Sequence, residues 1–168
     1  MSDRRRPSSR KLEADSADAL QSELNLTSPV ADLDWERYFD LRWRVLRKPW
    51  NQPRGSERDE LDQESFHLML RGQSGAVVAI GRLHLNSPDE AQVRFMAVDE
   101  SWRGRGLGSR VLKGLEQRAR TQTIKRVVLN AREEALDFYV KHGYRVEGSA
   151  ETLFGTIRHV RMRKDIGK

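Results

Sequence analysis

The spacing of apolar residues changes along the chain, and the changes separate predicted helices from predicted strands. From Trp35 to Leu46 the apolar residues recur every three or four positions, which is typical of one face of a helix. Asp34 is the predicted N-cap of this helix, and Pro49 lies just beyond its end because proline cannot continue a helix. The polar residues 50–64 predict a loop that contains one short helix.

Shorter segments of strand-like composition follow. They predict three successive strands at residues 65–71, 76–85 and 91–98. The glycine-containing segment 72–75 is short enough to join the first two strands as a hairpin. Residues 86–89, Asn-Ser-Pro-Asp, predict the turn before the third strand.

Helical spacing returns in the second half of the chain. Residues 107–121 place their apolar side chains on one face and predict a second helix. The unbroken apolar run in 126–130 is typical of a buried strand with a parallel neighbour. A third predicted helix follows and ends at Gly143, and the last predicted strands are 144–148 and 153–164. This order of elements predicts a single mixed α/β sheet with helices packed on its faces.

The length and charge of the chain divide it into a tail and a domain. With 168 residues, of which 37% are hydrophobic and 33% charged, it has length for one folded domain and a short tail. Residues 1–33 lack aromatic side chains and sustained apolar periodicity, so we assign them to a flexible tail and residues 34–168 to the domain. The tail carries five basic and six acidic side chains, so the net charge of +6 belongs to the domain. A basic domain favours anionic partners such as phosphorylated cofactors, nucleic acid or acidic surfaces.

Several classes of protein are excluded by what the chain lacks. Without cysteine it has no disulfide, no cysteine-ligated zinc, no iron–sulfur cluster and no thiol nucleophile. Its four histidines are scattered rather than spaced as metal ligands, so no metal site is expected. No apolar run approaches the roughly 20 residues that span a bilayer, so we expect a cytoplasmic protein without membrane contact.

The segment most informative about chemistry spans residues 98–109, where a strand is followed by a helix. Its alternating glycines are Gly104, Gly106 and Gly108. Glycine lets the backbone turn sharply, and the free N–H groups at a helix start attract anions. Because Arg103 and Arg105 add positive charge, a pyrophosphate is the expected ligand. The segment matches neither of two other phosphate-binding motifs. A Walker loop has Lys-Ser/Thr after its last glycine, which is missing here, and a dinucleotide-binding fingerprint has glycine where this chain has Ser109.

Two motifs in this half of the chain resemble those of the GNAT superfamily of N-acetyltransferases. The pattern Arg103-x-x-Gly106-x-Gly108 after a strand is similar to the family's motif A. The residues similar to its second motif are Asn130, Ala131, Arg132, Ala135 and 138–144. The resemblance covers about residues 35–164, and the segments 41–50 and 159–162 are similar to a bacterial subgroup of small acetyltransferases.

The resemblance implies a fold, a donor and a set of binding residues. The fold is a central, mostly antiparallel sheet of about six or seven strands with helices on both faces. Its fourth and fifth strands splay apart, and the gap holds the pantetheine arm of acetyl-CoA. Backbone groups of 96–98 pair with that arm beside Asn130, while N–H groups of 103–109 hold the pyrophosphate. The implied cofactor-binding residues are Met96, Ala97, Val98, Arg103, Gly104, Arg105, Gly106, Leu107, Gly108, Ser109 and Asn130. The family also implies a homodimer through the C-terminal strands.

The implied reaction is direct acyl transfer from the thioester to an amine. A backbone N–H near Met96 or Ala97 is placed to stabilise the oxyanion. Tyr139 is implied to face the sulfur, and a phenol with a pKa of about 10 can donate a proton to the leaving thiolate. Spacing alone would place Tyr139 in the core, and the motif favours the catalytic role.

The base that activates the amine is less well defined. Strand alternation puts Arg82 and His84 on one face, and His84 is our first candidate because a histidine pKa near about 6.5 suits a base. The other candidates are His67, His159, Glu57 and Glu64. Trp43 and Trp50 are candidates for lining the acceptor pocket. The acceptor is a primary amine of a small molecule or a peptide, with no motif that specifies it.

Two alternatives to the enzyme remain open at this stage. The basic domain and the arginines of residues 4–6 are compatible with a nucleic-acid-binding protein, although no aromatic and basic platform for single strands is evident. A non-catalytic acyl-CoA sensor would keep the fold and lose turnover. Tyr139 and the intact glycine loop favour the N-acetyltransferase over the sensor.

Overall fold

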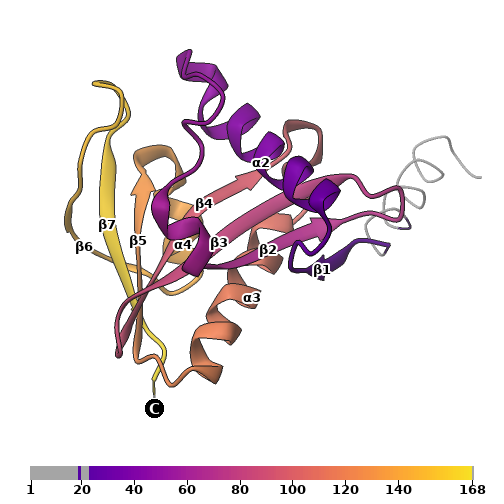
Figure 1. The fold of residues 1–168 in the computed structure, drawn as a ribbon. Helices are drawn as coiled ribbons and strands as arrows, with labels where there is room; N and C mark the ends of the chain where they lie inside the picture. Colours follow the sequence, from indigo (N-terminus) through magenta and orange to yellow (C-terminus); the bar gives the residue numbers. More distant parts are fainter. Residues whose placement is uncertain (1–18, 20–22, 168) are drawn as a thin grey trace, which may run out of the picture.

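A computed structural model describes residue 19 and residues 23–167, in which the strands form one sheet of seven in the order β1-β2-β3-β4-β5-β7-β6 (Figure 1). The strands are β1 (Asn25–Thr27), β2 (Phe66–Arg71), β3 (Val77–Ser87), β4 (Glu90–Val98), β5 (Arg126–Arg132), β6 (Arg145–Ser149) and β7 (His159–Asp165). The helices are α2 (Asp32–Leu46), α3 (Leu107–Thr121) and α4 (Leu136–Lys141). Short 3-10 helices are η1 (Lys48–Trp50), η2 (Glu60–Glu64), η3 (Glu100–Trp102) and η4 (Glu133–Ala135).

The predicted order of helices and strands is confirmed, with differences at both ends of the domain. Residues 25–27, which we assigned to the tail, add strand β1 to the edge of the sheet, where Leu26 is in register with Leu70. The rest of the tail assignment falls mostly on residues 1–18 and 20–22, outside the described residues. The last strand begins at 159 rather than 153, because Phe154 and Gly155 adopt left-handed conformations and form a turn.

The start of α2 also differs from the prediction. Its N-cap is Ala31, and Asp34 occupies the third helical position rather than the cap. The Asp34 carboxylate nevertheless turns back and accepts hydrogen bonds from the N–H groups of Val30 at 3.4 Å and Ala31 at 3.3 Å. The Asp34 side chain thus forms the half of a capping box in which the third helical residue accepts from the N–H of the N-cap residue.

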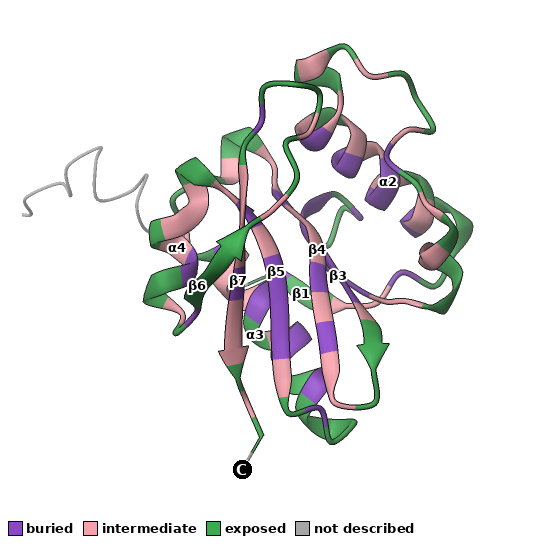
Figure 2. Ribbon diagram, turned by 90° about the vertical axis from the view of Figure 1, so that its left-hand side faces the viewer, coloured by how far each residue is buried: buried purple, intermediate pink, exposed green. Residues whose placement is uncertain are grey.

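The two faces of the sheet are covered by different helices (Figure 1). Helix α2 packs on one face, where the buried residues are Tyr38, Phe39, Leu41, Leu46, Met69, Val77, Ile80 and Ala97. Helices α3 and α4 cover the other face, in the larger core that contains Val111, Leu112, Leu115 and Tyr139. Buried residues concentrate on the central strands and the inner sides of the helices (Figure 2). This is the expected sheet with helices on both faces.

The sheet opens between β4 and β5. These strands are parallel, unlike all the other described strand pairs, and they are paired only from Glu90–Arg126 to Val93–Leu129. Beyond that point β4 continues to Val98 and β5 to Arg132 without pairing to each other. The predicted splayed pair is therefore confirmed, and the splay leaves backbone groups of both strands available to a ligand.

A bulge in β4 begins where the splay begins. The register of β4 with β3 shifts between Arg82–Arg94 and Ile80–Ala97, so that Phe95 and Met96 together oppose Gly81. Phe95 has a left-handed φ of 55°. A Cβ built on Gly81 would lie 2.6 Å from Met96 Sδ and 2.8 Å from a methyl carbon of Val111, so glycine is needed opposite the bulge. The bulge bends β4 away from β5 at the point where the cleft is required.

Candidate active site

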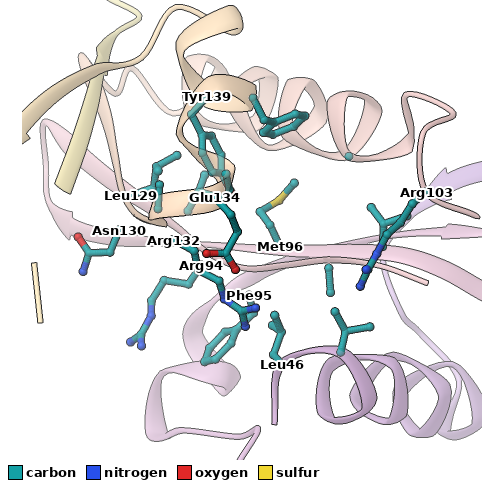
Figure 3. A pocket seen from close by; sticks show the side chains of 18 of the residues that line it. Leu46, Arg94, Phe95, Met96, Arg103, Leu129, Asn130, Arg132, Glu134 and Tyr139 are labelled. Carbon is teal, nitrogen blue, oxygen red and sulfur yellow. The ribbon is translucent and has the colours of Figure 1, made fainter. Parts of the chain in front are cut away.

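A cavity of about 740 Å³ lies where β4 and β5 separate. Its walls come from the end of α2, β4, the loop before α3, the end of β5, η4 and α4, and the segment leading into β7. Figure 3 shows Tyr139 on one side of this space, Leu46 and Phe95 on the other, and Met96 between them. Because residues from both faces of the sheet line it, the cavity extends through the sheet.

The glycine-rich loop forms one part of this wall and leaves the start of α3 open. Gly104 and Gly106 have left-handed φ values of 74° and 73°, and a Cβ built on either would meet nothing within 4 Å. Among the described residues no side chain caps α3 at Gly106, and the first helical bond runs from the Arg110 N–H to the Gly106 carbonyl oxygen at 3.2 Å. The N–H groups of residues 107–109 precede that bond, and free N–H groups at a helix start are suited to an anion.

The parts of β4 and β5 that are not paired with each other form the next part of the wall. Met96, Ala97 and Val98 line the cavity from β4, and Asn130 lines it from β5. The side-chain oxygen of Asn130 is buried without a hydrogen-bond partner in the part of the chain that the structure describes. An unpaired buried oxygen is unfavourable, so its position is suited to a ligand that donates a hydrogen bond.

Tyr139 lines the cavity from α4. Its side chain is 8% exposed, and its ring packs edge-on against Phe138 at 4.9 Å and Tyr144 at 5.8 Å between centroids. Burial raises the pKa of the Tyr139 phenol to about 12, and the positive charge of Arg132 opposes the rise. The phenol is therefore protonated at neutral pH and is held in one orientation by its aromatic neighbours.

The candidate bases separate according to their position along the splay. His84 is in register with Gln92, where β4 is still paired with β5, and it does not line the cavity. His159 lies at the open end of the splay, in register with Arg132, and does line it. The structure thus brings His159, and not our first candidate His84, into the space that Tyr139 faces.

The other residues singled out from the sequence lie outside the cavity lining. His67 is buried between the Tyr38 hydroxyl at 3.0 Å and the Asp62 carbonyl oxygen at 2.8 Å. The remaining residues that do not line the cavity are Glu57, Glu64, Trp43, Trp50 and Arg105. Of the predicted cofactor-binding residues, all except Arg105 line it.

An ionic network lies under the bulge, on the face covered by α2. The side chains of Arg42 and Arg82 are fully buried, and both hydrogen-bond to the Asp62 carboxylate, at 2.9 and 2.8 Å. Arg82 also pairs with Asp59. The two guanidinium carbons lie 4.1 and 4.7 Å from the centroid of the Phe95 ring. Each buried guanidinium therefore has a carboxylate partner, and the two guanidiniums pack against the ring of the bulge residue Phe95.

Three arginines that sequence reasoning did not single out as site residues also line the cavity. They are Arg47 at the end of α2, Arg94 on β4 and Arg132 at the end of β5. In the sequence each of them is a charged residue within or next to an apolar segment. That pattern alone does not indicate that the three side chains line one cavity. Burial and the charges of neighbouring arginines lower the pKa of Arg47, and burial lowers that of Arg132.

Two further observations concern metals and membranes. Within residues 23–167, no group of three or more histidine, aspartate or glutamate side chains is placed to hold a metal ion. No helix in that range is long and apolar enough to cross a membrane.

Comparison with known proteins first defines the class of the fold. The structure is similar to an acyl-CoA N-acyltransferase from Pseudomonas aeruginosa, with a TM-score of 0.72 and 22% identity over 84% of this chain and 99% of that one. It is also similar to an aminoglycoside 6′-N-acetyltransferase in complex with coenzyme A, with a TM-score of 0.73 and 15% identity over 86% of this chain and 98% of that one. The fold is that of the acyl-CoA N-acyltransferases.

Sequence comparison then defines the family. The acetyltransferase (GNAT) domain family matches residues 47–166. The uncharacterized N-acetyltransferase YjcF of Bacillus subtilis is 35% identical over 127 residues, which are 76% of this chain and 89% of YjcF. The chain belongs to the GNAT acetyltransferase family, and it is an enzyme that transfers acetyl groups to an amine-bearing acceptor. This assignment favours the enzyme over the nucleic-acid-binding protein and the acyl-CoA sensor.

Proposed function

We propose that the enzyme transfers an acetyl group from acetyl-CoA to a primary amine of a small molecule or peptide by direct attack on the thioester. The observation that carries this proposal is the continuity of one cavity from the open helix start at Gly106 to Tyr139, through the gap between β4 and β5. A long, thin ligand with an anionic group near one end and a reactive group at the other fits such a passage.

The residues present fit acetyl-CoA on three points. Gly104 and Gly106 leave space beside the N–H groups of the α3 start, which suits a pyrophosphate. Arg103 lines the same part of the cavity and adds positive charge. The unpaired oxygen of Asn130 suits an amide N–H, and the pantetheine arm carries amides.

The chemistry assigned to the chain's own groups follows from their positions. Acetyl transfer forms a bond between the amine nitrogen and the carbonyl carbon and breaks the carbon–sulfur bond, so an oxyanion develops and a thiolate leaves. Backbone N–H groups of Met96 and Ala97, in the part of β4 that is not paired with β5, are assigned to the oxyanion. Tyr139 is assigned to donate its proton to the leaving sulfur, and its raised pKa ensures that the proton is present.

We assign the role of general base to His159 in place of His84. His159 Nδ1 lies 2.9 Å from the Ile157 carbonyl oxygen. Because a carbonyl oxygen only accepts, Nδ1 carries the proton of the neutral ring, and this leaves Nε2 to accept one from the amine.

Replacing His159 with glutamine tests that assignment. We expect kcat/KM at pH 7 to fall by about tenfold to a hundredfold, since glutamine keeps a polar side chain and loses the base. The loss should shrink above pH 9, where a larger fraction of the amine is already deprotonated. Thiol release measured across pH gives the result for His159→Gln and for His84→Gln. A larger loss in His84→Gln than in His159→Gln would return the role of base to His84.

The proposed donor is tested by calorimetric titration with acetyl-CoA. We expect saturable one-to-one binding that changes little with salt, and absence of binding would contradict the proposed function.

In Gly106→Val the affinity for acetyl-CoA should fall at least about tenfold, because a β-branched residue is strained at a φ of 73° and the loop must shift. Gly148→Val is the matched control, since Gly148 lies on edge strand β6 outside the cavity lining. Equal affinity in the two variants would show that the loop does not hold the pyrophosphate.

A further inference from the structure

The face of the cavity opposite α3 is lined by guanidinium groups from three separate elements. The bulge places Arg94 and Phe95 on the same face of β4, so that the Arg94 guanidinium carbon lies 5.0 Å from the Phe95 ring centroid. Arg47, at the end of α2, lies 5.6 Å from the same ring. Phe95 thus holds two arginines of the cavity lining around one aromatic ring.

The third arginine is held in a similar way by rings behind the lining. Arg132 lies 4.4 Å from the Trp50 ring centroid, and Trp50 stacks on Phe154 at 6.5 Å. Phe154 in turn lies 5.5 Å from the Arg47 guanidinium carbon. A chain of cation–π and stacking contacts therefore connects Arg132 to Arg47 across the mouth of the cavity.

These guanidiniums are poorly compensated, in contrast to the buried network below them. Among the described residues, Arg47 and Arg132 form no ion pair, and the N–H groups of Arg47 bond to the carbonyl oxygens of Ser56 and Leu46, both at 2.9 Å. Arg94 forms a long ion pair of 3.7 Å with Asp59, which also pairs with Arg82. Three arginines with a single, long ion pair among them keep guanidinium N–H groups for an anion from elsewhere.

Acidic residues in the lining offset this charge only in part. The charge of Glu134 opposes the lowering of the Arg132 pKa by burial, but Glu134 and Glu151 are exposed, and neither forms an ion pair with another described residue. Charges in contact with solvent are screened, whereas Arg47 and Arg132 are partly buried. Burial and the repulsion of Arg94, Arg42 and Arg132 lower the pKa of Arg47, and the charge of Glu57 opposes this only in part.

The cofactor's pyrophosphate does not account for this second group of cations. Its proposed site is at the start of α3, and Figure 3 shows Arg103 at the far side of the cavity from Asn130 and Arg132. Arg132 is instead in register with His159, the proposed base, so the cations surround the position of the attacking amine. They belong to the acceptor half of the site.

We propose that the acceptor is a primary amine that carries a carboxylate, and that Arg47, Arg94 and Arg132 bind this carboxylate while the amine faces His159. This inference rests on the proposed function and names the class of its acceptor. An amino acid and the N-terminus of an acidic peptide are two sources of the same chemistry. A guanidinium binds a carboxylate through two parallel hydrogen bonds, which fixes the orientation of the amine as well as its affinity.

The test uses matched acceptors that differ only in charge. One pair is 4-aminobutyrate and 4-aminobutyramide, and the other is an amidated tripeptide that begins with aspartate and the same peptide beginning with asparagine. We expect kcat/KM to be at least about tenfold higher for the charged member of one pair, and the pair that shows this difference tells whether the acceptor is an amino acid or a peptide.

In Arg94→Gln and in Arg132→Gln the ratio of kcat/KM between the charged and the neutral acceptor should fall below about threefold, with the Kd for acetyl-CoA within about twofold of the wild type. Arg118→Gln, an exposed arginine of α3 outside the cavity, is the control and should keep the ratio.

The outcomes separate this inference from the proposed function. Equal kcat/KM within both pairs would overturn the anionic acceptor and leave acetyl transfer intact. A full ratio retained in both arginine variants would also overturn it, because another group would then bind the carboxylate. Failure of the wild-type protein to bind acetyl-CoA would instead contradict the proposed function.

Discussion

Replacing Tyr139 with phenylalanine is expected to lower kcat by about a hundredfold to a thousandfold, with the Kd for acetyl-CoA within about twofold of the wild type. Phenylalanine keeps the edge-on packing against Phe138 and Tyr144, so the loss is confined to the hydroxyl. Steady-state thiol release gives kcat, and calorimetry gives Kd. An unchanged kcat would remove Tyr139 from the role of proton donor.

The pH dependence and a neighbouring tyrosine sharpen this test. Burial raises the pKa of Tyr139 to about 12, so the phenol stays protonated throughout the range in which the enzyme can be assayed. The loss in Tyr139→Phe should therefore be the same from pH 6 to pH 9. Tyr144→Phe is the matched control, because the Tyr144 hydroxyl bonds to Glu116 at 3.1 Å and does not line the cavity. That variant should lose about 1 kcal/mol of stability and keep its kcat.

Replacing Asp62 with alanine is expected to lower the free energy of unfolding by about 3–5 kcal/mol. The Asp62 carboxylate accepts from Arg42 at 2.9 Å and Arg82 at 2.8 Å, and both guanidiniums are fully buried. Its removal leaves the buried Arg42 without a carboxylate partner among the described residues and leaves Arg82 with Asp59 alone, and solvent cannot reach the Arg42 guanidinium to compensate. Urea unfolding measures the change. Glu60→Ala, at an exposed position of η2, is the control and should change stability by less than about 0.5 kcal/mol.

The same carboxylate predicts how stability depends on pH. Burial by itself raises the pKa of Asp62, but the hydrogen bonds and charges of Arg42 and Arg82 outweigh it, and the pKa lies below its usual value. Because the pKa of Asp62 is lower in the folded state, its ionised carboxylate contributes fully to the free energy of unfolding above the unfolded-state pKa of about 3.9. This contribution is lost as the pH falls from there through the folded-state pKa. The wild type should therefore lose more stability than Asp62→Ala between pH 5 and pH 2. Parallel loss in both proteins, or a change in Asp62→Ala below about 1 kcal/mol at pH 7, would show that the network contributes little.

The fold was predictable where a periodic pattern is long, and it was missed where the pattern is short. Helix α3 and strands β2 to β5 were expected from their apolar spacing, and the structure has them within a few residues. Strand β1 has three residues with a single apolar side chain, Leu26, and it exists because Leu26 can pair beside Leu70. Such a strand is specified by its neighbour and not by its own sequence.

The site was predictable to the extent that it is local in sequence. The glycine loop, the residues 96–98, Asn130 and Tyr139 all belong to contiguous motifs, and all of them line the cavity. Arg94 and Arg132 converge only because β4 and β5 separate, which depends on the bulge at Phe95. The choice between His84 and His159 also depends on where β4 and β5 separate. Strand alternation predicts on which face of the sheet a side chain lies, but it does not predict how far that side chain is from the separation.

The bulge at Phe95 also has an evolutionary consequence. On β4, Ala91 and Val93 belong to the larger core, and Met96 and Val98 pack against it, with Phe95 as the one extra residue between the two halves. Without that codon the strand would alternate regularly, with every core side chain still on its own face, and β5 could pair along it without a gap. A single inserted residue is therefore enough to turn a continuous sheet into one with a cleft, and the insertion leaves the apolar side chains of both halves of β4 on the same face.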